Sequence, residues 1–178
     1  VSGSEWIRRF RQEGRILKTL EKRLDRFSLK LNQEKTKAIS FSKNQAKLGV
    51  RQDSFDYLGF SFYLGKSRNG TLVPRLKTSK KRYHEKLKKL THWCRKRRNT
   101  AKLRILWAEF CSKLRGHNQY YAVSFNGPMV ERFNHRAIWI FVKWMNRRSQ
   151  KRSLTWEKFE LFMIKFPPPR SLIRHQLF

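Results

Sequence analysis

A dense run of positive charge at residues 77–98 constrains the fold of this chain more than any other feature. Eleven of these 22 residues are Lys or Arg, and Glu85 is the single acid among them. Because so many cations on one helix repel one another, the helix needs strong core packing or a bound polyanion to be stable. Apolar residues recur in it at helical spacing: Tyr83, Leu87, Leu90 and Cys94. The segment is therefore predicted to be a helix, capped by Thr78-Ser79, with one packed face and one cationic face.

The rest of the chain shares this positive charge. Its 178 residues include 43 Lys+Arg and 12 Asp+Glu, which gives a formal net charge of +31. Such a protein attracts polyanions, so nucleic acid or an anionic membrane suits it better than a small-molecule substrate. Hydrophobic residues make up 39% of the chain, with 14 Phe and 6 Trp, which is enough for a folded core. A cationic face kept only for solubility is the alternative, although solubility normally mixes both signs of charge.

Neither a membrane nor a metal ion is expected as a partner, and no small-molecule substrate is expected for this chain. The longest apolar run, residues 137–142, is far shorter than the roughly 20 residues of a spanning helix. Cys94 and Cys111 have no C-x-x-C partner and are expected to be reduced thiols of an intracellular protein. The five His residues are scattered among cations, so no metal site is predicted. The first residues show no signal-peptide pattern, and the lack of an initiator Met indicates a piece of a longer protein.

Residues 1–76 are predicted to combine a helix with strands. The helix is expected over residues 5–27, and its buried face carries Ile16, Leu17, Leu20, Leu24 and Phe27. Strands are expected at residues 38–41 and 55–63. The Asn69-Gly70 turn that follows predicts a β-hairpin, and Pro74 indicates that the second hairpin strand lies at a sheet edge.

Residues 77–178 are predicted to be helical. After the cationic helix, further helices are expected over about 101–122, from Pro128 onward, and from Ser153 or Thr155 to Phe166. The apolar stripes of the two long ones are Leu103, Leu106, Phe110 and Leu114, and Phe133, Ala137, Ile140 and Trp144. The predicted fold class is therefore α+β, with a small segment of helix, strands and hairpin followed by a three- to four-helix bundle.

Aromatic residues lie among the cations and offer rings for base stacking. They are Trp93, Tyr120, Tyr121, Trp139 and Trp144. Rings and Arg planes both favour unpaired bases of single-stranded RNA. Core packing is the alternative, and we favour it for Trp139 and Trp144. Tyr120 and Tyr121 are expected to be more open, because the residues before them are polar.

Five segments resemble the reverse transcriptase/maturase proteins of group II introns, in the same order and spacing. Residues 31–36 are similar to the L-N-x-x-K-T segment of the palm, and residues 55–60 resemble the F-x-F/Y-L-G-F segment of the primer grip. Residues 114–121 are similar to the L-R-G-x-x-x-Y-Y segment of the maturases. Residues 147–150 and 166–170 also fit the bacterial members. The resemblance covers essentially the whole chain.

This resemblance implies that residues 1–76 are the C-terminal end of the palm, and that residues 77–178 are the thumb or maturase (X) region. Leu58, Gly59 and Phe60 would then lie in a primer-grip-like hairpin near the 3′ end of a primer. Lys35 would lie near the phosphates of the incoming nucleotide, or else would be a structural surface lysine. The implied partners are group II intron RNA and an RNA template with its DNA primer.

Two sets of residues are expected to bind RNA. The first neutralises the phosphates of any RNA and comprises Lys80, Lys81, Lys88, Lys89, Arg95 and Arg97. The second belongs to the maturase-like segment and comprises Arg115, Asn118, Tyr120 and Tyr121. The alternative for this second set is that residues 115–121 merely close a helix against the bundle.

One departure from the family concerns catalysis. In the family, the tyrosine–alanine–aspartate–aspartate motif that binds the catalytic metals lies just upstream of a segment like residues 1–4. Two-metal chemistry needs carboxylates that converge on metals about 4 Å apart, and this chain has no adjacent Asp pair. We therefore predict no catalytic residue and no cofactor in this chain, although full-length members use Mg²⁺. The chain alone is not expected to polymerise.

Three functions follow from these observations. The first is an RNA-binding maturase/thumb fragment that assists intron splicing. The second is a part of an active RNA-directed DNA polymerase whose catalytic part lies outside this chain. The third is a remnant of a mobile element without activity. The implied location is the cytoplasm of a bacterium, with an organelle as the alternative.

Overall fold

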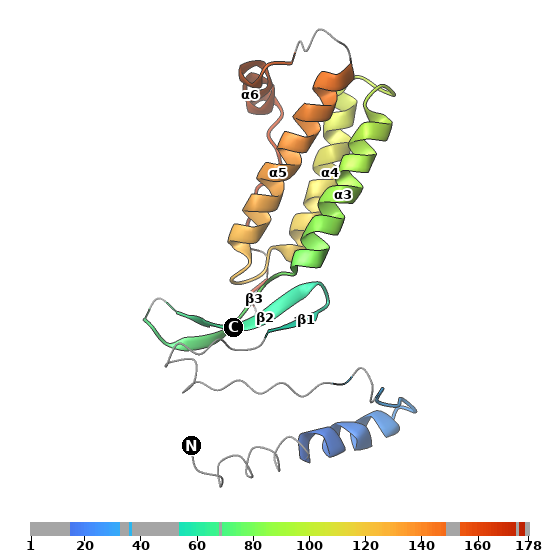
Figure 1. The fold of residues 1–178 in the computed structure, drawn as a ribbon, viewed down its shortest axis with the longest axis vertical. Helices are drawn as coiled ribbons and strands as arrows, with labels where there is room; N and C mark the ends of the chain where they lie inside the picture. Colours follow the sequence, from blue (N-terminus) through green and yellow to red (C-terminus); the bar gives the residue numbers. More distant parts are fainter. Residues whose placement is uncertain are drawn as a thin grey trace. The chain divides into compact units, whose positions relative to one another are not determined.

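The computed structural model describes residues 15–32, 36, 54–67, 69–148, 154–173 and 175–176 (Figure 1). The chain divides into two compact units, residues 1–42 and residues 43–178. The first contains a helix over residues 15–25. The second contains β1 (Phe55–Tyr57), β2 (Phe60–Lys66), β3 (Leu72–Thr78), α3 (Lys80–Arg97), α4 (Leu103–Tyr121), α5 (Gly127–Met145), the short 3-10 helix η1 (Asn146–Arg148) and α6 (Trp156–Lys165). The predicted α+β class is confirmed, while the domain division after residue 76 stays a prediction.

The helix of the first unit exposes its apolar side. Ile16, Leu20 and Phe27 are 66%, 41% and 75% exposed, so the prediction that they are buried was wrong, whereas Leu17 and Leu24 are half-buried. The physical reason is that one helix cannot cover its own apolar stripe, which needs a second packed layer. Lys35 and the strand expected at residues 38–41 lie outside the described residues.

The three strands form an antiparallel sheet in the order β1-β2-β3. The hairpin predicted at Asn69-Gly70 is confirmed, and it joins β2 to β3. Gly70 has a φ of 74°, and its N–H donates to the carbonyl of Ser67 over 3.1 Å. Among the described strands, β3 lies at an edge of the sheet, as predicted, and it contains Pro74. An edge tolerates proline because no further strand needs its missing N–H group.

The segment at residues 55–63 is two strands, so the prediction of one continuous strand there was wrong. Leu58 and Gly59 form a tight turn, across which Tyr57 pairs with Phe60. Both turn residues have positive φ, 50° and 84°, as a type I′ hairpin turn requires. That turn type normally uses Asn-Gly or Asp-Gly, and a leucine at its first position is unusual. Gly59 is therefore the one residue of this turn that a turn pattern would have marked.

The helices of the bundle begin and end near their predicted positions. Ser79 caps α3, and its side-chain oxygen accepts a hydrogen bond from the Arg82 N–H over 3.4 Å. Pro128 lies in the first turn of α5, where its missing N–H costs nothing. Thr155 caps α6 by accepting a hydrogen bond from the Lys158 N–H. The prolines after Phe166 follow the end of that helix, as expected.

The core of the bundle is built from aromatic rings. Phe110, Phe141 and Phe159 are fully buried, and they come from α4, α5 and α6. Trp107 stacks on Phe110 at 5.2 Å between ring centroids and meets the edge of Phe159 at 5.3 Å. Its indole N–H donates to the Phe166 carbonyl over 2.9 Å, so this large ring is buried with its polar atom satisfied. Leu90 and Cys94 of α3 reach the same core, which confirms the predicted packed face of that helix.

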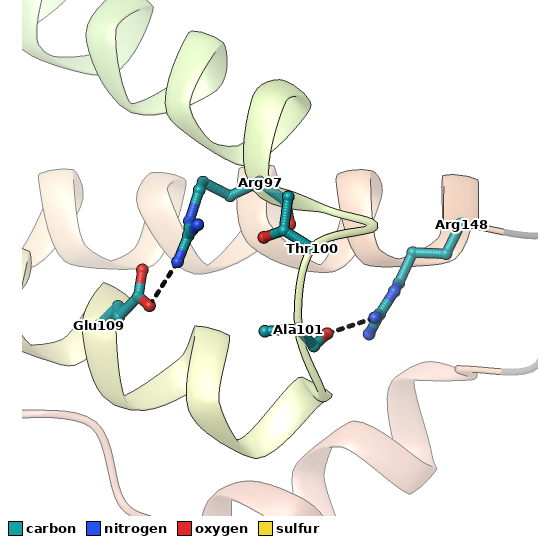
Figure 2. A network of polar contacts seen from close by, with 5 residues as sticks. All are labelled: Arg97, Thr100, Ala101, Glu109 and Arg148. Atoms are coloured by element: carbon teal, nitrogen blue, oxygen red, sulfur yellow. Dashed lines mark hydrogen bonds and ion pairs between the residues drawn. The ribbon is translucent and has the colours of Figure 1, made fainter.

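Polar contacts hold the turn between α3 and α4 (Figure 2). Arg97 of α3 and Glu109 of α4 form an ion pair of 2.7 Å across that turn. Arg148, at the end of η1, donates to the Ala101 carbonyl within it. These contacts fix the end of the bundle at which α3, α4 and η1 meet.

The two tryptophans for which core packing was favoured differ in position. Trp139 is 48% exposed and stacks on Trp156 at 4.6 Å, so its expected core position was wrong. Trp144 is half-buried at the edge of the core, with the guanidinium groups of Arg98 and Arg147 over its ring at 5.4 and 5.1 Å.

The different burial of Phe110 and Trp144 predicts different stability losses. Phe110→Ala should lower the free energy of unfolding by about 3–5 kcal/mol, because it empties a fully buried site. Trp144→Ala should cost clearly less, because its ring is half-buried. Urea unfolding followed by circular dichroism measures both. Equal losses would show that the burial of these two rings does not decide their contribution.

Candidate nucleic-acid interface

The structure brings together two of the segments that resemble the family, the hairpin turn at Leu58–Gly59 and the end of α4. The Tyr120 hydroxyl donates to the Leu58 carbonyl over 2.8 Å. The Phe60 ring stacks on Tyr120 at 5.8 Å between centroids and lies tilted against Tyr121 at 5.2 Å. The primer-grip-like turn and the paired tyrosines thus form one junction, although 62 residues separate Leu58 from Tyr120.

Gly59 lies at the centre of this junction. Its carbonyl accepts a hydrogen bond from the Ser79 N–H over 2.9 Å, which fixes the turn against the start of α3. A Cβ atom at this position would lie 2.9 Å from the Tyr121 hydroxyl oxygen and 3.4 Å from Cγ of Arg82. Because its φ is also positive, glycine is required here both by conformation and by space.

The buried side chain of Asn126 supports the junction from inside. Its Oδ1 accepts a hydrogen bond from the Thr78 N–H over 2.7 Å, and its Nδ2 donates to the Tyr121 carbonyl over 2.8 Å. Nδ2 also donates to the Thr78 hydroxyl over 2.9 Å. One amide therefore joins the ends of β3 and α4 at the residue before α5. Pro128 marked the start of the next helix, but no local signal in the sequence marked this role of Asn126.

The two tyrosines of the maturase-like segment face opposite environments. Tyr120 is 50% exposed, as predicted, but Tyr121 is 3% exposed, so the expectation that it is open was wrong. Its ring fills the space between Phe60 and His117, whose centroid lies 4.7 Å away. Successive residues of a helix point about 100° apart, so adjacent tyrosines seldom share one environment.

Asn118 is buried as well, with 3% of its surface exposed. Its Nδ2 donates to the Arg170 carbonyl over 3.4 Å, in the segment that follows the three prolines. This segment runs back along α4, from the contact of Phe166 with Trp107 to a parallel bridge between His175 and Val123. A third segment that resembles the family, residues 166–170, thereby contacts residues 114–121.

Most of the predicted phosphate-binding cations lie on the exposed side of α3. The exposed ones are Lys80, Lys81, Lys88, Lys89 and Arg95. Arg97 differs, because it is half-buried and its charge is compensated by Glu109. Arg115, on α4, is exposed. Between side chains of the described residues, ion pairs occur at Arg82–Glu85 and Arg97–Glu109, so most of the positive charge on α3 is uncompensated.

Two hollows adjoin α3. One, of about 300 Å³, lies beside the hairpin turn and is lined by Asp56, Tyr57, Leu58, Gly59, Ser79, Lys81, Arg82 and Glu85. The other, of about 350 Å³, lies between α3 and α4 and is lined by both cations and apolar side chains. Both therefore open beside the cationic face.

Groups that could perform chemistry are few in the described part of the chain. It contains no cluster of three or more His, Cys, Asp or Glu side chains that could hold a metal ion. Cys94 and Cys111 are free thiols, and burial raises their pKa values to about 12 and about 11, so both stay protonated at neutral pH. Asp56 accepts a hydrogen bond from the Ser61 hydroxyl within the sheet. None of the described helices is both long and apolar enough to cross a bilayer.

Comparison with the models of known protein families, with curated proteins and with solved structures finds no match to this chain. The case for a function therefore depends on its own residues, their geometry and the five segments discussed above.

The junction predicts different costs for alanine at two glycines. Gly59 and Gly70 both have positive φ, so Gly70→Ala should cost about 1–2 kcal/mol of stability for backbone strain alone. Gly59→Ala should cost more, because its Cβ would also collide with the buried Tyr121 hydroxyl, whereas at Gly70 nothing lies within 4 Å. Chemical denaturation measures both variants.

The Tyr121→Phe background provides the control for this comparison. Removing the hydroxyl removes the collision, so Gly59→Ala should cost less in that background than in the parent. If the cost is the same in both backgrounds, Tyr121 does not determine the space around Gly59.

Proposed function

We propose that this chain binds RNA as the thumb and maturase part of a group II intron reverse transcriptase, and that it assists splicing of the intron. The observation that carries the proposal is the exposed, uncompensated cationic side of α3, which begins directly at the junction of the hairpin turn and Tyr120. Intron RNA and a template–primer duplex are the partners that this surface suits.

The cations of α3 supply the sequence-independent part of the binding. Each Lys or Arg that neutralises a phosphate releases a counterion, so affinity falls as salt rises. The helix is 18 residues long, or about 27 Å at 1.5 Å per residue, so its charges can follow the backbone of a duplex or of a folded RNA. A phosphate backbone also relieves the repulsion between these side chains.

The junction supplies the rings and the shape. Tyr57, Leu58 and Tyr120 are 60%, 65% and 50% exposed, so an apolar and aromatic edge lies beside the start of the cationic helix. Such an edge suits an unpaired base or the last base pair of a primer. By resemblance, Leu58, Gly59 and Phe60 would hold that primer end, and the backbone of Gly59 could be approached closely only without a side chain.

The burial of Asn118 and Tyr121 separates them from the other two residues of the maturase-like segment that were predicted to bind RNA. A side chain that is 3% exposed offers almost no surface to RNA, so Tyr121 positions the junction from within, and Asn118 holds the segment that follows the three prolines. Arg115 and Tyr120 stay as the direct contacts. Arg97 leaves the phosphate-binding set for a similar reason, because it is paired with Glu109.

A salt titration tests the electrostatic part. Lys88→Gln should weaken binding to all RNAs alike and lower the slope of log affinity against log salt by about one unit or less. Lys165→Gln removes the same charge from α6, which lies at the left edge of the bundle while α3 lies at the right edge (Figure 1). This control should leave the slope nearly unchanged in filter binding. Equal slopes for the two variants would contradict the proposal that RNA binds along α3.

A second experiment tests the specific part. Arg115→Ala and Tyr120→Leu should each weaken binding to a group II intron RNA by about 1–3 kcal/mol, and weaken binding to a random duplex less. Tyr120→Phe keeps the ring and loses only the hydrogen bond to Leu58, so it should retain most of the affinity. Thermal unfolding of each variant controls for folding. Equal losses on both RNAs would leave only the electrostatic part of the proposal.

A further inference from the structure

The hollow between α3 and α4 combines positive charge with an apolar floor. Its lining carries four cations and one carboxylate: Arg82, Lys86, Lys89, Lys113 and Glu85. Glu85 is paired with Arg82 over 3.2 Å, so three lysines are left to attract an anion. Leu90, Leu114 and Phe133 form the apolar part. A volume of about 350 Å³ lies in the range of small-molecule sites.

A tryptophan adds a flat surface to this pocket. Trp93 is half-buried on α3, and the Lys113 ammonium from α4 lies 5.2 Å from the centre of its ring. Indole is the ring best suited to cation–π contacts and to stacking against a planar base. A positive charge and a ring are thus held together at one wall.

His117 gives the floor unused hydrogen-bonding capacity. It is 6% exposed, and neither of its ring nitrogens has a hydrogen-bond partner among the described residues. Its ring stacks on Phe133 at 3.6 Å between centroids. Burial and the nearby charge of Lys86 lower its pKa to about 3, so at neutral pH it is an uncharged ring with one donor and one acceptor. Buried polar groups normally have partners, so an unpaired one beside a pocket points to a ligand.

Residue 116, in the wall on α4, is glycine, so no side chain enters the pocket at this position. A Cβ atom there would meet nothing within 4 Å, and Gly116 shows no positive φ that would require glycine. Glycine inside a helix lowers its stability relative to alanine. Backbone geometry and local packing therefore do not require glycine here, and a side chain much larger than alanine would take up space in the pocket.

We propose that this pocket binds one nucleotide, with its phosphate on Lys86, Lys89 and Lys113 and its base against Trp93 above the floor of His117. The nucleotide is either an unstacked residue of a bound RNA or a free nucleotide, since both offer the same phosphate and ring. In the first case the site rests on the proposed RNA-binding function and deepens it. An acidic peptide lacks the planar ring that Trp93 and the apolar floor suit.

Two pairs of variants test the pocket. Gly116→Leu should fill it without changing any charge, and Gly116→Ala is its small control. Lys89→Gln removes a lining charge, and Lys96→Gln removes the same charge from an exposed position of α3 outside the pocket. Thermal unfolding should show that all four variants fold, since both replacements of Gly116 favour a helix.

Binding is measured by calorimetry with adenosine monophosphate and with inorganic phosphate, and by fluorescence anisotropy with a labelled uridine octamer and an RNA duplex. The monophosphate should bind more tightly than phosphate. Gly116→Leu and Lys89→Gln should weaken it by about tenfold, as expected for one lost stacking or charge contact. Gly116→Ala and Lys96→Gln should stay near the parent. If the octamer follows the same pattern, the nucleotide belongs to RNA.

Several results would contradict the proposal that this pocket binds a nucleotide. These are a monophosphate that binds no better than phosphate, a Gly116→Leu variant that binds like the parent, or equal losses for Lys89→Gln and Lys96→Gln. If the duplex still binds with a steep salt dependence in those cases, the proposed RNA-binding function stands without the pocket. If the monophosphate binds as expected but neither RNA does, the pocket stands as a free-nucleotide site and the proposed function fails.

Discussion

The side-chain amide of Asn126, fully buried, makes the hydrogen bonds on which the junction depends. It satisfies the Thr78 N–H at the end of β3 and the Tyr121 carbonyl at the end of α4. Since a buried backbone group without a partner costs about 1–3 kcal/mol, one side chain holds two chain ends in fixed positions. Ser79, the next residue after Thr78, then donates to Gly59 and caps α3. The turn, the cationic helix and Tyr120 are thus positioned together.

The charge of α3 becomes tolerable because the packing of its other side is strong. Leu90 and Cys94 contact a core whose largest members are aromatic rings of the other helices, and such rings bury large areas. Arg82 and Arg97 are neutralised locally, whereas the lysines of the outer side are not. A helix of this composition keeps a potential that attracts polyanions and still folds, which is the combination that RNA binding requires.

The tyrosine pair shows how one short segment serves two purposes. Tyr121 points into the molecule and fills the space that only a glycine at position 59 leaves free. Tyr120 points outward, and its hydroxyl binds the hairpin turn while half of its surface stays open. One turn earlier, Gly116 and His117 both line the pocket between α3 and α4. Gly116 lies in its open wall, and the buried His117 forms its floor. The maturase-like segment is therefore both a packing surface and a candidate binding surface.

Local signals in the sequence determined the parts of the fold that local energies control. Ser79 and Thr155 marked helix starts, Asn69-Gly70 marked a hairpin and Pro74 an edge strand, because caps, positive φ and a missing N–H act within a few residues. The apolar stripes predicted the packed faces of α3, α4 and α5, because residues three and four apart lie on the same side of a helix.

Only the tertiary structure decided which residues that are distant in the sequence contact one another. The Leu58–Gly59 turn, the burial of Asn118 and Tyr121, the exposure of Trp139 and the pocket between α3 and α4 all depend on partners that are many residues away. Periodicity states which residues share a helix face, but it does not state how much of that face another element covers. The cations of α3 were visible in the sequence, and the site that they form with Trp93 and His117 required the fold.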